Sequence, residues 1–337
     1  MLKRCLKRIS KMKHVFYIHS NTVLLSALGA IEHDSIALHD VIFLYSRSFT
    51  SSIVDISIRI VDITDIWRFS MAHDFVYNPV KHRKLIARID KIFEDEVSDD
   101  FILYLPHFTI PLFSAMITNP RCTSLNLLQE GAFSFFEGNK LRLKDKLKNL
   151  LFSNKRVWWY STWDVPKNKV GVLKLHNSYA ISKDFFEPCK YTNNLLIKWP
   201  SLDEQKYKYP SCSNFFLFES AVEMGYVNID DYLESCKQLI RDSKVSKCYL
   251  KFHPGQSEEN IAKIKSLFDG ICFSVLSNDV PFELIISSSK NLNLFGFSTS
   301  LLKFGIDYNH HVVSYLDLLC SKSESFRKHA IIGNYKF

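Results

Sequence analysis

The stretch NFFLFESAVEMGYVNIDDYLESCKQLIRDSKVSKCYLKFHPGQ, residues 214–256, decides the fold. Its apolar run at 215–218 is typical of a short buried strand. Residues 228–242 then carry a helical pattern, and Asn228 is a suitable N-cap. Residues 247–252 form a second short apolar run that leads directly into His253. A strand, a helix and a strand in this order predict a parallel α/β sheet.

The same alternation continues on both sides of this stretch. Toward the C-terminus we expect helices over 258–268 and 281–287, strands over 271–275 and 291–297, and a further helix that begins at Ser298. Toward the N-terminus the pattern predicts strands over 14–18, 40–45, 53–63, 100–105 and 124–128, and helices over 23–31 and 81–96.

A region of different composition separates the two series. Residues 139–210 are rich in Lys, Trp, Asn and Pro and have weak periodicity, which is typical of a region between domains. We therefore predict an α/β fold with two Rossmann-like domains that face a central cleft. Its expected parts are an N-terminal domain over 1–150, an inter-domain region over 151–212, a C-terminal domain over 213–310 and a helical tail over 311–337.

Composition restricts the class of protein. The chain has 337 residues, of which 47% are hydrophobic and 23% charged, so it has enough apolar material for two packed cores. It contains no uninterrupted apolar run of about 18 residues, the length that a spanning helix requires. The first residues also lack the apolar segment of a secretory signal. We therefore expect a cytoplasmic protein.

The N-terminus concentrates positive charge in a chain whose formal net charge is +8. Such a cluster is suited to an anionic membrane surface, which would place the protein on the inner face of the inner membrane. A solubilising tail is the alternative interpretation. No nucleic-acid motif follows the cluster, so we expect no nucleic-acid partner. The basic residues are Lys3, Arg4, Lys7, Arg8, Lys11 and Lys13.

The cysteines indicate neither a disulfide framework nor a zinc site. The eight cysteines include no C-x-x-C pair, whereas zinc ligands usually come in close pairs. We therefore expect reduced thiols, mostly in the core, and no metal site.

Two polar loops of the second series have the chemistry of a phosphate site. Ligands of such sheets bind beyond the carboxyl ends of the strands. His253 leaves one strand with its backbone constrained by Pro254, and its imidazole can donate to a phosphate oxygen. Ser298, Thr299 and Ser300 lie where a strand gives way to a helix, whose first turn offers free N–H groups to an anion. The structural alternatives are a turn histidine and an N-cap at Ser298.

Two further loops each supply a carboxylate. Glu130 follows a strand in the sequence Gln129-Glu130-Gly131, which suits a general base. Glu283 opens a short helix and can accept hydrogen bonds from ribose hydroxyls. The structural alternatives are a surface turn for Glu130 and a favourable helix-start acid for Glu283.

The four loops occur in the order acid–Gly, His–Pro, Glu and Ser/Thr cluster. In this order, and in the run FFLFES…NIDDYLESCKQLIRD…CYLKFHPGQ, the chain resembles the bacterial sialyltransferases. It is similar in particular to the lipooligosaccharide sialyltransferase family, with relatives among the polysialyltransferases. The resemblance extends from the strand at 14–18 to about Tyr308. It implies a GT-B-like fold with an acceptor-side N-terminal domain and a C-terminal domain that binds a CMP-sugar.

The resemblance also implies roles for the loop residues. His253 would contact the CMP phosphate and help the leaving group depart, and Glu130 would deprotonate the acceptor hydroxyl. The family usually has two acidic residues before the glycine, and here the first of these positions is Gln129. Ser20 and Asn21, in the first strand-end loop, and Gln129 would touch the acceptor or the sialic acid. The implied CMP-binding residues are Lys251, His253, Pro254, Glu283, Ser298, Thr299 and Ser300.

The implied reaction is a single inverting displacement from CMP-sialic acid to a galactose-terminated, lipid-linked bacterial glycan. The acceptor would be a lipopolysaccharide O-antigen, a lipooligosaccharide or a capsule precursor. CMP carries one phosphate, so no metal cofactor is expected. The alternatives are a GT-B transferase that uses another CMP-sugar such as CMP-Kdo, a non-catalytic nucleotide- or glycan-binding module, and a membrane-attached scaffold.

Overall fold

The computed structural model divides into two compact units, Met1–Pro200 and Ser201–Phe337. It describes residues 12–332 with the exception of 52, 55–56, 108–109, 132–146, 148–149, 152–155, 158–173, 182, 184–192 and 201–206. The basic N-terminal cluster, apart from Lys13, lies outside the described residues, and so does the inter-domain tryptophan group at 158, 159 and 163.

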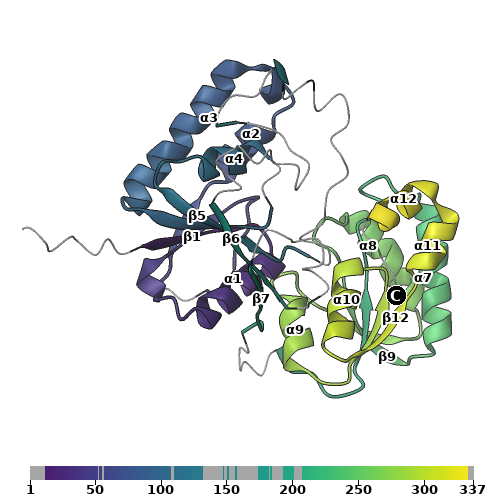
Figure 1. Ribbon diagram of the computed structural model, residues 1–337. Coiled ribbons are helices and arrows are strands. Elements are labelled where there is room, and N and C mark those ends of the chain that lie inside the picture. The colour runs from purple at the N-terminus through teal and green to yellow at the C-terminus, as the bar shows by residue number, and fades with distance from the viewer. Residues whose placement is uncertain are drawn as a thin grey trace, which may run out of the picture. The chain divides into compact units, whose positions relative to one another are not determined.

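The first unit is built on a parallel sheet of seven strands (Figure 1) in the order β3-β2-β1-β4-β5-β6-β7. Helix α1 covers one face, and α2, α3 and α4 cover the other. The strands are β1 (Lys13–Ile18), β2 (Val41–Tyr45), β3 (Arg59–Asp62), β4 (Phe101–Leu105), β5 (Cys122–Leu128), β6 (Leu175–Ala180) and β7 (Asn193–Leu196). The helices are α1 (Asn21–His33), α2 (Thr64–Met71), α3 (Pro79–Ile92) and α4 (Pro111–Ile117).

The second unit has a parallel sheet of five strands in the order β10-β9-β8-β11-β12. Helices α9 and α10 lie on one face, and α7, α8 and α11 lie on the other (Figure 1). The strands are β8 (Asn214–Leu217), β9 (Lys247–Lys251), β10 (Cys272–Val275), β11 (Asn293–Gly296) and β12 (His311–Ser314). The helices are α7 (Ile229–Ser243), α8 (Glu258–Lys265), α9 (Phe282–Ser288), α10 (Thr299–Asp307), α11 (Leu316–Lys322) and α12 (Glu324–Ile332).

Side-chain caps fix where several helices begin. The Ser20 hydroxyl accepts from the Val23 N–H at the start of α1, and the Asn228 side chain accepts from the Asp231 N–H at the start of α7. These bonds satisfy backbone donors that have no partner within the helix. The cap predicted at Asn228 is thus confirmed.

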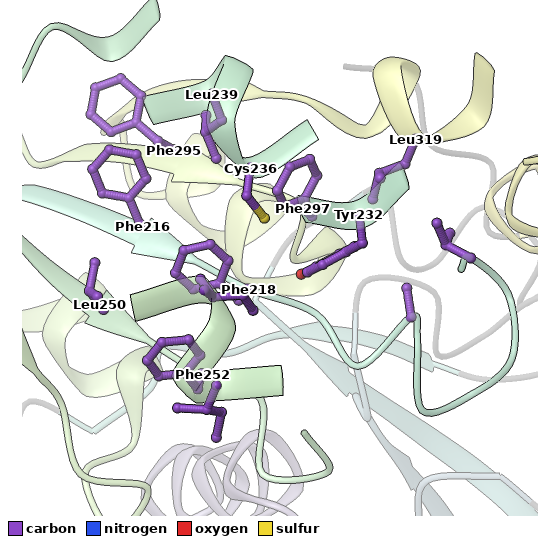
Figure 2. Close-up of a cluster of buried hydrophobic side chains, with 14 of the residues drawn as sticks. Phe216, Phe218, Tyr232, Cys236, Leu239, Leu250, Phe252, Phe295, Phe297 and Leu319 are labelled. Carbon is purple, nitrogen blue, oxygen red and sulfur yellow. The ribbon is translucent and has the colours of Figure 1, made fainter. Parts of the chain in front are cut away.

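Each unit has a hydrophobic core of its own. In the first unit, Phe16 stacks on Tyr104 with ring centroids 3.9 Å apart between β1 and β4. In the second unit, Phe216, Phe218 and Phe252 pack beneath α7 with Tyr232 and other residues of that core (Figure 2). The central strands of both sheets are buried on two faces, which explains their continuous apolar runs.

The predicted α/β fold with two Rossmann-like halves is confirmed, but its internal boundaries differ from the expected ones. Strands β6 and β7 belong to the first sheet, although they fall in the predicted inter-domain region 151–212. Strand β12 joins the second sheet from the predicted helical tail. These short strands contain many polar residues, so hydrophobic periodicity did not reveal them. The strand expected over 53–63 is confined to Arg59–Asp62 among the described residues.

Among the residues that the structure describes, no helix combines the length and the apolar character needed to cross a membrane.

Candidate functional site

The first unit brings two histidines and a carboxylate together at one edge of its sheet. His19 follows β1, His107 follows β4 and Glu130 follows β5. Because these strands are parallel and adjacent, their carboxyl ends lie along the same edge. The Glu130 carboxylate contacts both rings: Oε1 lies 2.8 Å from His19 Nε2, and Oε2 lies 3.9 Å from His107 Nε2.

Electrostatics keeps Glu130 ionised. Burial by itself would raise the pKa of this carboxyl, but the hydrogen bond from His19, the charges of His107 and His19 in their protonated forms and the charge of Arg47 lower it to about 2. Burial lowers the pKa of His107 to about 4, against the opposing effect of Glu130. At neutral pH the centre therefore holds a carboxylate beside a neutral His107 imidazole. This ring can accept a proton, and the carboxylate would stabilise the imidazolium that forms.

The ring of His19 is fixed by its surroundings. Its side chain is only 4% exposed, and its Nε2 faces Glu130. Its Nδ1 is buried and has no hydrogen-bond partner among the described residues. An orphaned N–H is rarer in proteins than an orphaned acceptor. We therefore assign the tautomer in which Nε2–H donates to Glu130, which leaves His19 as the group that positions the carboxylate.

Gln129 performs a structural task beside this centre. Its side chain is completely buried. The side-chain amide donates to the Gly131 carbonyl at 3.2 Å, and its Oε1 accepts from the Ile181 N–H at 2.9 Å. A carboxylate at this position could not make the first of these bonds. Gln129 therefore links the ends of β5 and β6 and fixes the backbone that carries Glu130.

Ser20 and Asn21, predicted to touch the substrate, lie at the start of α1 on the same edge. Ser20 is the N-cap of that helix, and Asn21 is its first residue. A substrate contact of these two residues and of Gln129 stays a prediction.

In the second unit, His253 follows β9 at the carboxyl edge of the sheet. Its ring is 43% exposed, and its Nδ1 accepts a hydrogen bond from the Gly255 N–H at 3.0 Å. Nε2 then carries the hydrogen of the neutral ring, and it lies 3.8 Å from Oε1 of Glu219, which follows β8. Pro254 and Gly255 complete the tight turn that holds this orientation. The ring can therefore donate to a ligand from Nε2.

Lys251, predicted to bind CMP, has a different set of contacts. Its ammonium group donates to the carbonyls of Ser277 and Val280 at 3.0 and 3.3 Å and lies 3.4 Å from the Asn278 side chain. The side chain is largely buried, and burial lowers its pKa against the opposing charges of Glu283 and Asp279. Lys251 therefore holds the loop that leads into α9.

The remaining predicted residues lie at the starts of α9 and α10. Glu283 is in the first turn of α9 and is 8% exposed. Ser298 is the N-cap residue of α10, but its side chain makes no capping hydrogen bond. This result removes the simple capping interpretation. Thr299 and Ser300 form the first turn of α10, which follows β11 on the edge that also carries His253.

Gly296 is required at the carboxyl end of β11, just before Ser298. Its φ is +146°, and a Cβ atom there would lie 2.1 Å from the Leu217 carbonyl oxygen. At Gly296 the backbone of β11 therefore lies so close to β8 that no side chain fits, and the chain continues from there to Ser298.

No group of three or more His, Cys, Asp or Glu side chains in the described part of the chain is arranged to hold a metal ion.

Sequence reasoning missed His19, His107 and Glu219. Each follows a buried strand by one or two positions, so a systematic search for polar residues at strand ends would have found them. Their convergence depends on strand order, which the sequence does not show.

Comparison with known proteins agrees with this architecture. Neither the family models nor the curated proteins yield a match. A putative UDP-N-acetylglucosamine 2-epimerase from Listeria monocytogenes is similar in structure with a TM-score of 0.50 and 9% identity, over 97% of this chain and 88% of the other. The S. aureus MnaA–UDP structure has a TM-score of 0.50 and 8% identity, over 89% and 78%. The E. coli heptosyltransferase WaaC with ADP has a TM-score of 0.40 and 11% identity, over 96% and 98%.

These similarities establish the fold class: two Rossmann-like units of the GT-B type. They contradict the assignment to the bacterial sialyltransferases, because the Listeria monocytogenes protein, similar with a TM-score of 0.50, is described as a putative UDP-N-acetylglucosamine 2-epimerase. The prediction of a CMP-sialic acid:β-galactoside sialyltransferase is therefore wrong. The physical reason is that an acid–Gly, a His–Pro and a Ser/Thr loop lie at strand ends, where any enzyme of this fold places its polar groups. Their order does not identify the nucleotide or the sugar.

Proposed function

We propose that the protein is an enzyme that acts on a nucleotide-activated sugar. The observation that carries this proposal is the Glu130 carboxylate held between His19 and His107 at the ligand-binding edge of a Rossmann-like sheet. Such a centre accepts a proton from a hydroxyl or an activated C–H group of a sugar. The structurally similar MnaA was determined with UDP, which makes a UDP-sugar the first substrate to test.

The second unit would hold the nucleotide. His253 would donate from Nε2 to a phosphate oxygen, and the first turn of α10 after Ser298 would offer N–H groups to the same charge. When the bond between the anomeric carbon and the phosphate oxygen breaks, the electron pair goes to that oxygen. Donation from His253 Nε2 would stabilise the charge that develops on this oxygen.

The test is to incubate the full-length protein with UDP-N-acetylglucosamine and to follow UDP release and the sugar product by NMR. UDP release or a C2 epimer without an acceptor supports epimerisation or elimination, whereas release that depends on an added sugar acceptor supports transfer. UDP, ADP and CMP are compared by calorimetric titration. Nucleotide binding without any turnover would contradict the enzymatic proposal, and no binding to any nucleotide would overturn it completely.

Glu130→Gln is the decisive variant. We expect it to lower turnover by roughly a hundredfold or more, the usual scale for loss of acid–base catalysis, with nucleotide affinity unchanged. Glu259→Gln is the matched control, because Glu259 lies on the exposed surface of α8, where it pairs with Lys263. Wild-type turnover in Glu130→Gln would remove this centre from the reaction.

A further inference from the structure

The loop after β2 contains two residues in an unfavourable backbone conformation. Arg47 and Ser48 both have φ = +57°, although neither is glycine. The left-handed region is disfavoured for such residues and is found mainly where the surrounding structure enforces it, often at functional sites. Here the Ser48 N–H donates to Thr64 Oγ1 at 2.9 Å, and Arg68 donates to the Ser48 hydroxyl at 3.1 Å.

This conformation places the Arg47 guanidinium on the ring of Trp67. The Arg47 Cζ atom lies 5.3 Å from the ring centroid, within the range of a cation–π contact. An aromatic face holds a guanidinium in place and leaves the N–H groups at its rim available to a planar anion. Arg47 itself is exposed.

Within the described residues, Arg47 has no ion pair with a carboxylate. Other arginines of the chain do have one: Arg59 pairs with Glu96, Arg68 with Asp65, Arg156 with Asp90 and Arg327 with Glu324. A guanidinium that is exposed and held on an aromatic ring is suited to bind a carboxylate or a phosphate, because its planar set of N–H donors matches the geometry of both anions.

Arg47 also lies beside the Glu130 centre. Strand β2 is adjacent to β1, whose end carries His19. Neighbouring strands are about 4.8 Å apart. Ser46, which precedes Arg47 in the chain, shares a hydrogen bond of 2.6 Å with the Tyr17 hydroxyl. The Tyr17 ring in turn lies 5.5 Å from the His19 ring. Arg47 and the carboxylate held at His19 therefore lie on the same edge of the sheet, at the ends of strands from one continuous set of neighbours.

We propose that Arg47, held on Trp67, binds a negatively charged substituent of the sugar or acceptor, a carboxylate or a phosphate, whose reacting group meets Glu130. This subsite would favour acidic sugars or sugar phosphates over neutral sugars. The inference rests on the proposed function, because the anionic group is assigned to its substrate. It differs from the nucleotide phosphate, which is assigned to the second unit.

The test uses the full-length protein and three probes of equal ring size: glucuronate, glucose 6-phosphate and glucose. Binding is measured by ligand-detected NMR titration. We expect at least one charged probe to bind at least tenfold more tightly than glucose. A preference for glucuronate identifies a carboxylate subsite, and a preference for glucose 6-phosphate identifies a phosphate subsite. Equal binding of all three probes, or no binding of either charged probe, would overturn the proposal.

Two variants separate charge from backbone strain. Arg47→Asn removes the guanidinium but keeps a residue that tolerates φ > 0, so it is expected to fold and to lose the preference for the charged probe. Ser48→Gly relieves the neighbouring strain without touching the charge, so it is expected to melt at a higher temperature and keep that preference. Arg59→Met is the control for a general loss of positive charge. Unchanged preference in Arg47→Asn would refute the assignment.

The two proposals can fail separately. Turnover of a nucleotide sugar without any preference for charged probes would refute the Arg47 subsite alone. Arg47-dependent binding of a charged probe without nucleotide binding would refute the proposed function and leave an anion site on the first unit.

Discussion

Burial and hydrogen bonding set the electrostatics of the Glu130 centre. Burial disfavours a charged His107, and the bond from His19 favours a charged Glu130. Both effects lower a pKa in the folded protein, so the folded protein binds fewer protons than the unfolded chain over part of the acid range. They therefore link protonation to stability.

We predict that acid weakens the folded state in a specific window. The pKa of His107 is about 4 in the folded protein and 6.5 in a free chain, so its contribution to stability is complete above pH 6.5 and is lost as the pH falls toward 4. Glu130 adds a further loss of folding stability as the pH falls from 4.5 to about 2. In thermal melts, His107→Gln should flatten the decline between pH 6.5 and 4, whereas the exposed control His39→Gln should not. An identical decline in both variants would refute this account.

A second residue-scale prediction concerns Gly296. Gly296→Ala should lower the free energy of unfolding by roughly 3 kcal/mol, because a Cβ would collide with the Leu217 carbonyl at a φ that alanine avoids. Gly270→Ala is the matched control: its φ is +79°, but nothing lies within 4 Å, so a cost of about 1 kcal/mol is expected. If denaturant titration gave equal losses of unfolding free energy for the two variants, the positive φ and not the close approach to β8 would account for the cost.

At the scale of elements, helix α4 depends on two basic side chains from the segment that follows β5. Arg156 donates to Asp90 of α3 through both terminal nitrogens at 2.7 Å and also to the Ala115 carbonyl at 3.2 Å. Lys174 donates to the carbonyls of Ile117 and Asn119. These bonds add partners to the carbonyls at and just beyond the end of α4 and attach its C-terminus to α3.

Removal of this attachment should destabilise the first unit. We expect Arg156→Met to lower the free energy of unfolding by about 2 kcal/mol, because charged hydrogen bonds to Asp90 and to a backbone carbonyl are lost. Arg327→Met serves as the control, since Arg327 pairs with Glu324 on the exposed surface of α12 and its loss should cost about 0.5 kcal/mol or less. Urea titrations of both variants measure the difference, and similar small effects would refute a structural role for Arg156.

At the scale of the whole molecule, each unit has a separate core, so we expect two unfolding transitions in differential scanning calorimetry. Gly296→Ala should lower only one of them and Arg156→Met only the other. If the nucleotide site is on the second unit, UDP should raise the transition that Gly296→Ala lowers. A single transition that both variants shift equally would show that the two units unfold together.

Local pattern predicted most of the second unit and the centre of the first. The apolar runs at 14–18 and 215–218, the cap at Asn228 and the strand before His253 all appear in the structure close to the expected positions. Strands β6, β7 and β12 were missed because they are partly polar. They become strands only through pairing with neighbours that the sequence does not identify.

The sequence by itself determined the alternation of strands and helices, their caps and the placement of polar residues at strand ends, because each of these depends on neighbouring residues. Only the tertiary structure decided which of those strand ends meet. The order β2-β1-β4-β5 brings Arg47, His19, His107 and Glu130 to one edge, and the order β9-β8-β11 does the same for His253, Glu219 and Ser298. Strand order is set by long-range pairing and burial, so the chemistry of this protein emerges only when its sheets are assembled.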